Sequence, residues 1–572
     1  MKSSSAVFSV RVRILSALFV CAALLLALRL YFVQIVHGEG YKKSAQGQYF
    51  EASSEINDRS DIFFSKKEGD LVAAAVMQAG WGLAISPSEI TNPDEVFEKI
   101  SAVVPIDRER FFSSVAKKND PYENIGFRIN NEAAARIRKE KIPGIILAPD
   151  QWRSYPGGAL AAHAIGFVGY KGDAKVGVYG LEALYEDSLA KKSGLYVNPF
   201  AEIFANVGAA LSADPTENQG SIITSIEPQV QARLEEILSG VLKAYSSKSA
   251  AGIVMDPRTG EIIALSIRPT FDPNTYNTVD DSSLFTNILV ENVYEMGSIM
   301  KPLTVAAGID AGAITPKTTY NDKGCIERSG KKICNYDGKA RGVVGMQEVL
   351  NQSLNLGATF IADTMGHNVF SKYIHAFGLG EKTSIDLPNE ARGIIHAIDR
   401  GYDVDYASAS FGQGIAMTAV GMIRGLASLA NGGVLPSPHI VKGIRLESGI
   451  VRSITPPQGG RVLKPETVQT VSEMLVKVFD NALLGGILKQ EHYSIAAKTG
   501  TAQIADPSGR GYYEDRFLHS FFGYFPAHDP KFIVFLITLE PHGAEFASAT
   551  LARPFLDITK FLINYYDIVP DR

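Results

Sequence analysis

A serine and a lysine three residues apart, Ser298 and Lys301, are the side chains in this sequence best suited to nucleophilic chemistry. They follow Gly297, which permits a tight turn, and they lead into an apolar, helix-forming segment at 303–309. If a helix begins near Ser298, both side chains lie on one face within reach of each other. A hydroxyl needs a neighbouring base to attack, and a buried lysine kept neutral can take its proton. The pair therefore predicts a serine nucleophile with a lysine base.

The same spacing occurs elsewhere in the chain, for example at Ser114 with Lys117 and at Ser329 with Lys332. A chain of this composition contains about two such pairs by chance. An ordinary helix start or turn with a solvated lysine is the simpler interpretation of each of them. The pair at Ser298 therefore needs support from other motifs.

That support comes from two later motifs, Ser353-Leu354-Asn355 and Lys498-Thr499-Gly500-Thr501. The first offers a hydroxyl for proton relay and an amide that both donates and accepts. The second reads as a strand with a lysine cation for a substrate carboxylate, two threonine hydroxyls, and a glycine where the backbone of a ligand comes close. An edge strand here could also pair with an extended peptide. The three motifs in this order are typical of enzymes that react with penicillin.

The composition excludes some other classes. A chain of 572 residues predicts two to four domains, and 46% hydrophobic with 20% charged residues is an ordinary globular composition. A net charge of -5, without a dense basic tract, argues against nucleic-acid binding. The 10 histidines are scattered, so we expect neither a metal site nor a cofactor.

The N-terminus predicts a membrane anchor. Lys2, Arg11 and Arg13 precede an apolar run at 14–36, which is long enough to span a bilayer. The positive charges keep the N-terminus in the cytoplasm, so the rest of the chain lies outside. A cleaved secretory signal with its apolar region at 14–28 is the competing interpretation, but the chain stays apolar at 30–33. Both interpretations export the same domains.

The other cysteines flank a predicted hairpin. Cys325 and Cys334 enclose eight residues with a Ser-Gly turn. In an oxidising compartment they could pair, and two reduced cysteines remain the alternative. Cys21 lies inside the apolar run, after Val20, so it is a poor lipid-attachment site.

The remaining pattern predicts an α+β fold. Helices are expected at 131–140, 227–242, 343–351, 417–430 and 551–566, and strands at 251–255, 261–266, 493–502, 520–525 and 531–539. We expect three parts: an anchor with its cytoplasmic tail at 1–36, a mixed α/β pedestal at 37–215, and a catalytic domain at 216–572.

Over nearly all of its length the chain resembles a class B penicillin-binding protein, a monofunctional D,D-transpeptidase that cross-links bacterial peptidoglycan. Besides the three motifs, the resemblance rests on Arg153-Ser154-Tyr155-Pro156, His163-Ala164-Ile165-Gly166-Phe167, Gly180-Leu181-Glu182, Ile385-Asp386-Leu387-Pro388-Asn389-Glu390 and Phe411-Gly412-Gln413-Gly414. The family implies an antiparallel five-stranded sheet flanked by helices, behind a single-pass anchor in the cytoplasmic membrane. Size and the lack of appended C-terminal modules resemble the cell-division member more than the elongation member.

The resemblance also implies roles for the motif residues. Ser298 would attack the penultimate D-alanine of a stem peptide, with Lys301 accepting the proton. Ser353 would relay protons to the leaving amine, and Asn355 would hold the substrate amide. Lys498 and Thr499 would bind the terminal carboxylate, beside Gly500, and the backbone N–H groups of Ser298 and Thr501 would form the oxyanion hole. β-Lactams would acylate Ser298, and a membrane glycosyltransferase with division-complex proteins would be the partners.

Two departures from the family pattern stand out. Met296 replaces the usual proline, which would loosen the turn before Ser298. The segment 59–65 keeps Arg59, but Ser60 replaces a glycine and Phe64-Ser65 replace Asp-Arg, which puts contacts of the membrane-proximal module in doubt. Two alternative functions use the same residues: a hydrolase, either a D,D-carboxypeptidase or a β-lactamase, and a β-lactam sensor or idle division scaffold.

Overall fold

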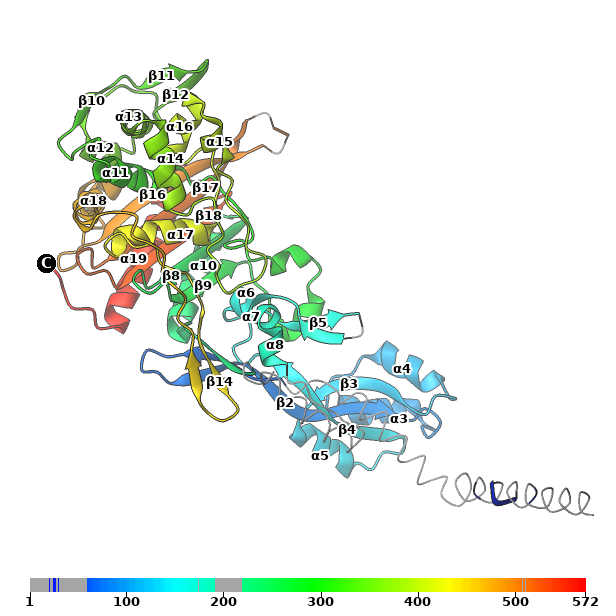
Figure 1. Ribbon diagram of the computed structural model, residues 1–572. Coiled ribbons are helices and arrows are strands. Elements are labelled where there is room, and N and C mark those ends of the chain that lie inside the picture. The colour runs from blue at the N-terminus through cyan, green and yellow to red at the C-terminus, as the bar shows by residue number, and fades with distance from the viewer. Residues whose placement is uncertain are drawn as a thin grey trace, which may run out of the picture. The chain divides into compact units, whose positions relative to one another are not determined.

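The computed structural model describes residues 20, 24–26, 29, 59–172, 174–190, 219–506, 508–509 and 511–572. Most of the predicted anchor and both predicted domain boundaries lie outside these residues. Within the described ranges no helix combines the length and apolar character needed to cross a membrane. The described chain forms two compact units, one containing Met77–Trp152 and the other Arg59–Val76 with Arg153–Arg572 (Figure 1).

The smaller unit is a mixed α/β module. It contains the later part of β2 (Leu71–Ile85), β3 (Glu123–Ile129) and β4 (Ile145–Ser154), with both β3 and β4 paired to β2. Its helices are α3 (Pro93–Ser101), α4 (Arg108–Ala116) and α5 (Asn131–Lys139). Asparagine or aspartate side chains cap each helix N-terminus. The helix predicted at 131–140 is confirmed.

A five-stranded antiparallel sheet forms the centre of the larger unit. Its order is β16-β17-β18-β8-β9, built from β8 (Ser249–Met255), β9 (Ile262–Arg268), β16 (Ala496–Ala505), β17 (Tyr512–Phe525) and β18 (Phe532–Leu539). The predicted α+β class and sheet are thus confirmed, and β16 is an edge strand. Strands β8 and β18 are buried along nearly their whole length, because helices cover both faces.

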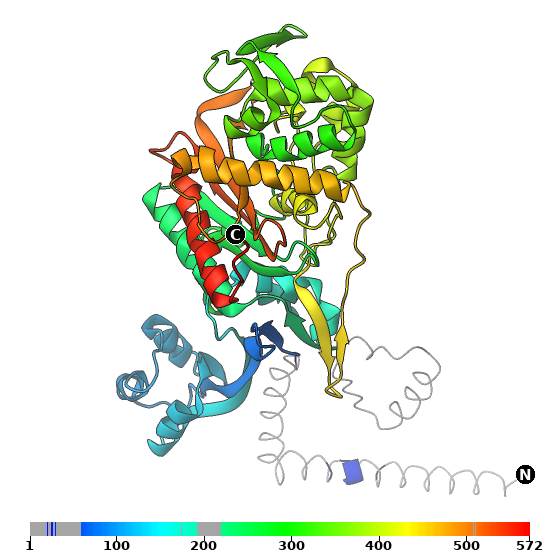
Figure 2. The same ribbon diagram turned by 90° about the vertical axis from the view of Figure 1, so that its left-hand side faces the viewer.

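Helices α10 (Pro228–Ala244) and α19 (Ala547–Tyr565) pack together and against this sheet, as Figure 2 shows in green and red. A second group of elements lies in the chain between β9 and β16. It comprises α11 (Lys301–Asp310), α12 (Met346–Asn351), α13 (Asn355–Met365), α14 (His367–Ala376), α15 (His396–Arg400), α16 (Asp403–Ala409), α17 (Ala419–Ala427) and α18 (Pro465–Lys477). Helix α11 contacts both α13 and α18, and α18 contacts β16. Packing of these helices therefore brings the three motifs toward one strand.

Short strands complete the larger unit. A second sheet has the order β15-β14-β7-β1-β2, from β1 (Ile62–Ser65), β7 (Gly220–Thr224), β14 (Val441–Leu446), β15 (Val451–Ser453) and the start of β2. Two-stranded ladders join β5 (Val168–Lys171) to β6 (Ala174–Gly177) and β10 (Thr319–Asp322) to β13 (Gly342–Gly345). Helices α6 (Ala162–Ile165), α7 (Gly180–Leu184) and α8 (Glu186–Leu189) are single turns. The prediction of a helix at 343–351 is wrong for its first residues, because β13 pairs with β10 there.

The segment at 59–65, whose sequence departs from the family pattern, takes part in a buried ion-pair network. Arg59 Nε lies 2.6 Å and Arg153 Nε 2.7 Å from the two carboxylate oxygens of Glu182, and all three side chains are buried. Phe64 is buried in the core, and Ser65 Oγ donates to the Thr224 carbonyl oxygen at 2.6 Å. The residues that replace Asp-Arg of the family pattern therefore contribute to packing.

The cysteine hairpin is formed by β11 (Cys325–Arg328) and β12 (Lys331–Cys334), with Cys325 opposite Cys334 in the register. The two cysteines form a disulfide. Ser329 and Gly330 make the turn with positive φ values of 48° and 74°. The predicted hairpin is confirmed, and the question of its pairing is answered by the disulfide.

We expect one reactive thiol per chain when the protein is denatured without reductant, and three after reduction, because a disulfide leaves one of the three cysteines free. Thiol titration under denaturing conditions measures both numbers. The Cys21→Ser variant is the matched control and should give none without reductant. Three thiols in the unreduced protein, purified from an oxidising compartment, would contradict the disulfide.

Candidate active site

Ser298 and Lys301 lie side by side at the start of a helix. Residues Gly297–Met300 form a 3₁₀ turn (η5) that continues directly into α11. Because a 3₁₀ turn has three residues per turn, the side chains at positions 298 and 301 eclipse each other. Lys301 Nζ lies 2.9 Å from Ser298 Oγ, within hydrogen-bond distance. The lysine is fully buried and the serine only half-buried, so the hydroxyl stays open to a substrate.

Backbone contacts with one neighbouring segment hold the loop before Ser298. Tyr294 and Met417 exchange two backbone hydrogen bonds of 2.9 and 3.0 Å, and Gly297 N donates to Gly412 O at 3.0 Å. Gly412 has a φ of 81°, and a Cβ there would lie 2.3 Å from the Gly297 carbonyl oxygen. Only glycine fits such a contact. Met296, in place of the family's proline, is fully buried in a turn that these bonds hold.

Ser353 links the two lysines. Its Oγ lies 3.1 Å from Lys301 Nζ and 3.1 Å from Lys498 Nζ, and its carbonyl oxygen accepts a hydrogen bond from Lys301 at 2.5 Å. Ser353 has a φ of 56°, which is uncommon for a residue other than glycine. The turn between α12 and α13 therefore holds a strained residue so that its hydroxyl reaches both amines.

Both lysines have lowered proton affinities. Burial and the charge of Lys498 hold the pKa of Lys301 well below 10.5, and burial lowers the pKa of Lys498 to about 7. Lys301 is 0% exposed and Lys498 is 2% exposed. Neither lysine forms an ion pair with an acidic residue in the described part of the chain. Both amines lie beside Ser353 Oγ, so a charged Lys498 disfavours a proton on Lys301. A neutral Lys301 can then accept the proton of Ser298.

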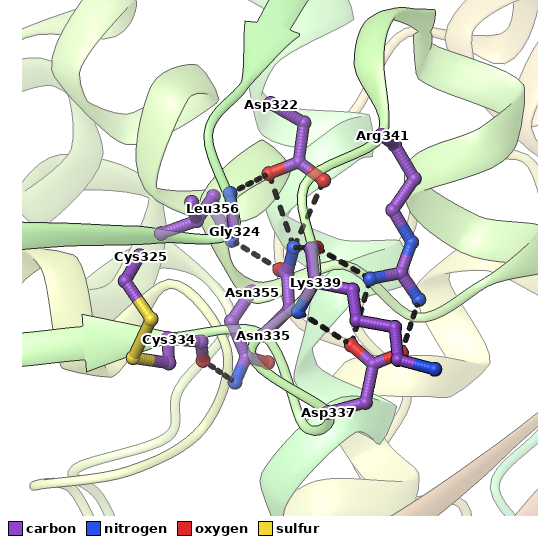
Figure 3. Close-up of a disulfide and its surroundings, with 10 residues drawn as sticks. All are labelled: Asp322, Gly324, Cys325, Cys334, Asn335, Asp337, Lys339, Arg341, Asn355 and Leu356. Carbon is purple, nitrogen blue, oxygen red and sulfur yellow. Dashed lines mark hydrogen bonds and ion pairs between the residues drawn. A yellow bond between two sulfur atoms is a disulfide. The ribbon is translucent and has the colours of Figure 1, made fainter.

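Asn355 lies two residues after Ser353, but its side chain is held by a different segment. It is the first residue of α13, and its Nδ2 donates to the Cys334 carbonyl oxygen at 2.9 Å (Figure 3). The next residue is held in the same way, since Leu356 N donates to Asn335 Oδ1 at 3.2 Å. Among the described residues the Asn355 side chain makes no hydrogen bond to the two lysines or two serines. The disulfide hairpin therefore supports the end of the helix that carries the asparagine.

The last motif lies on edge strand β16, as predicted. Lys498 Nζ donates to the Thr499 carbonyl oxygen at 2.9 Å, and Thr501 Oγ1 accepts from Ala547 N, the first residue of α19, at 3.1 Å. A Cβ on Gly500 would lie 2.8 Å from the Met296 carbonyl oxygen and 2.4 Å from Ser520 Oγ. The glycine thus makes room for the nucleophile loop.

Sequence reasoning missed one contact beside the nucleophile. Tyr512 Oη lies 2.9 and 3.1 Å from the two carboxylate oxygens of Glu295, and Gly414 N donates to the same carboxylate at 3.1 Å. Glu295 is three residues before Ser298, but no spacing rule connects it to a tyrosine 217 residues later. Only the folded structure reveals the pair.

A serine beside a buried lysine, linked through Ser353 to a second buried lysine, is an arrangement that can support acyl transfer through the serine. The family comparisons agree with it. A family model described as the penicillin binding protein transpeptidase domain matches residues 250–559, more than half of the chain, and one described as the penicillin-binding protein dimerisation domain matches residues 67–199. The chain therefore belongs to the penicillin-binding proteins, and the assignment made from the three motifs is confirmed.

Individual relatives match over most of their length. Stage V sporulation protein D of Bacillus subtilis is 29% identical over 559 residues, covering 96% of this chain and 84% of the relative. A probable peptidoglycan D,D-transpeptidase FtsI of Caulobacter vibrioides is 28% identical over 524 residues, covering 90% and 79%. The crystal structure of penicillin binding protein 2X from Streptococcus thermophilus superposes with a TM-score of 0.71 at 20% identity, covering 89% and 80%, and so shares the fold.

Proposed function

We propose that the protein is a serine D,D-transpeptidase that cross-links peptidoglycan stem peptides through an acyl-enzyme on Ser298. The observation that carries this proposal is the continuous hydrogen-bond path from Ser298 through Lys301 and Ser353 to Lys498. The printed names of relatives as peptidoglycan D,D-transpeptidases support the substrate class.

The first half-reaction releases D-alanine. Neutral Lys301 takes the Ser298 proton as Oγ attacks the carbonyl carbon of the penultimate D-alanine. The resulting oxyanion accepts hydrogen bonds from the backbone N–H groups of Ser298 and Thr501. The proton then passes from Lys301 through Ser353 to the leaving nitrogen, the peptide bond breaks, and terminal D-alanine leaves. An ester between Ser298 and the stem peptide remains.

The second half-reaction reverses these steps. An amine from a neighbouring stem attacks the ester carbonyl and gives its proton back along the same path, which restores the Ser298 hydroxyl. Lys498 and Thr499 bind the terminal carboxylate of the donor stem, beside Gly500, and Asn355 holds its amide. The strained ring amide of a β-lactam fits the same position and acylates Ser298.

The remaining parts of the proposal concern the cellular setting. The run at 14–36 anchors the chain in the cytoplasmic membrane, and the domains at 37–215 and 216–572 lie outside the cell. The protein acts in septal wall synthesis with a membrane glycosyltransferase and division-complex proteins. Relatives named FtsI support this division role.

The test is a product analysis. Purified protein is incubated with uncross-linked glycan strands that carry pentapeptide stems, using strands with lysine and strands with diaminopimelate in parallel. We expect D-alanine release together with cross-linked dimers, detected by mass spectrometry. D-Alanine release with tetrapeptide monomers alone would establish a carboxypeptidase instead. A penicilloyl-enzyme that hydrolyses within seconds would indicate a β-lactamase, and penicillin labelling without either product would indicate a sensor.

A further inference from the structure

The Glu295 carboxylate joins three segments that are far apart in the sequence. Glu295 belongs to the nucleophile loop, Gly414 to the segment after α16, and Tyr512 is the first residue of β17. The tyrosine hydroxyl lies within 2.9 to 3.1 Å of both carboxylate oxygens, and Gly414 N lies 3.1 Å from one of them. One side chain therefore connects the loop of Ser298 to the far end of the β16–β17 hairpin.

These hydrogen bonds are the polar support of the Glu295 carboxylate. In the described part of the chain no lysine or arginine forms an ion pair with it. Burial raises the pKa of Glu295, whereas the hydrogen bonds from Tyr512 and Gly414 lower it. Burial and the neighbouring carboxylate raise the pKa of Tyr512, so its hydroxyl keeps its proton and donates. A neutral donor facing an ionised acceptor makes a stronger hydrogen bond than two neutral groups do.

The Glu295–Tyr512 hydrogen bond lies at the far end of the β16–β17 hairpin. Tyr512 lies opposite Ala505 in the β16–β17 ladder, at the end of the strand that begins with the Lys498 motif. Near the start of that strand, Gly500 packs against the carbonyl oxygen of Met296, the residue that follows Glu295 in the loop. The loop is thus fixed to the hairpin at two places, by packing at Gly500 and by the Glu295–Tyr512 hydrogen bond.

We propose that Glu295 and Tyr512 form a brace that positions Ser298 relative to strand β16 during acylation. Attack on a peptide aligned along β16 requires the Ser298 Oγ at the right distance from the carbonyl carbon, and small displacements of a nucleophile lower rates strongly. The brace limits movement of the nucleophile loop away from the strand. Glu295 and Tyr512 are therefore positioning residues, and their role rests on the proposed function.

The test separates non-covalent binding from the covalent step. Stopped-flow measurements with a fluorescent penicillin give the dissociation constant of the initial complex and the acylation rate constant. We expect Tyr512→Phe and Glu295→Ala each to lower the acylation rate constant about tenfold, with the dissociation constant changed less than twofold. The acylation rate constant of the double variant should fall no further than that of the single variant with the larger loss. Glu295→Gln, whose amide oxygen still accepts from Tyr512, should recover most of the rate.

Tyr513→Phe is the matched control. Tyr513 is the next residue in the hairpin, and its ring contacts Arg516. This variant therefore tests whether loss of any tyrosine hydroxyl in the hairpin changes the rate. Tyr512 is 38% exposed, so loss of its hydroxyl leaves no buried cavity. A merely structural contact would lower the melting temperature and leave the acylation rate constant of the folded protein unchanged. That outcome, or independent effects that multiply in the double variant, would overturn the brace.

The two proposals fail in different ways. A wild-type protein that penicillin does not acylate at Ser298, judged by mass spectrometry of the labelled peptide, overturns the proposed function and the brace with it. Wild-type acylation at Ser298 together with an unchanged rate in Tyr512→Phe overturns the brace alone.

Discussion

Replacing Ser298 with alanine should reduce covalent penicillin labelling to background and lower D-alanine release by roughly 10⁴-fold or more. The reason is that Ser298 Oγ is the hydroxyl placed 2.9 Å from a buried lysine, and alanine has no atom that can form the ester. Labelling is measured with a fluorescent penicillin on denaturing gels, and D-alanine release by a coupled enzymatic assay. The melting temperature should change little, because the substitution removes a single half-buried oxygen.

Two of the other Ser-x-x-Lys sequences provide matched controls. Ser114 Oγ donates to Glu123 at 3.0 Å, and Lys117 forms an ion pair with the same carboxylate at 2.6 Å, so Glu123 engages both side chains of this pair. Ser329 lies in the turn of the disulfide hairpin. Ser114→Ala and Ser329→Ala should therefore keep full labelling. Labelling that survives in Ser298→Ala and is lost in either control would show that the nucleophile is assigned to the wrong residue.

The second large effect is expected at Lys301. Methionine has a similar length but no amine, so Lys301→Met should lower the acylation rate constant by about a thousandfold while penicillin still binds non-covalently. Lys301 accepts the Ser298 proton only in its neutral form, so acylation by the wild-type protein should fall as the pH drops through the lowered pKa of Lys301. On the alkaline side the rate should fall above about pH 7, where Lys498 loses the charge that attracts a carboxylate.

A pH profile of the acylation rate constant checks these signs. The acidic limb should disappear in Lys301→Met, and the alkaline limb in Lys498→Met. Lys192→Met, at the Lys-Ser-Gly sequence upstream of the nucleophile, is the control and should leave both limbs unchanged. An acidic limb that persists in Lys301→Met would assign the proton transfer to another group.

The sequence alone predicted most of the candidate site, because its motifs depend on local spacing. Ser298 and Lys301 meet within one turn of a helix, and the later motifs were recognisable by their residue types and order. The five-stranded sheet was predictable for a similar reason, since its strands are apolar runs separated by clear turns. Local pattern failed at 342–345, where Val343 and Val344 form a strand only because β10 lies beside them.

Contacts between distant segments could not be predicted. Position 500 needs a glycine because the Met296 carbonyl oxygen, about 200 positions away along the chain, packs against it. The donation from Asn355 to Cys334 and the pairing of Glu295 with Tyr512 likewise join elements that no periodicity relates. Such contacts follow from how helices and strands pack, and a spacing rule within one element carries no information about them.

In the part of the chain that the structure describes, Lys498 forms no ion pair with an acidic residue, so we expect ligand binding at Lys498 to be coupled to proton uptake. A ligand that carries a carboxylate supplies the missing negative charge and raises the proton affinity of Lys498, whose pKa of about 7 leaves it only partly protonated in neutral solution. Binding then draws a proton from the surrounding buffer. A carboxylate ligand should therefore bind more tightly as the medium becomes mildly acidic, whereas an uncharged analogue gains nothing from the same change.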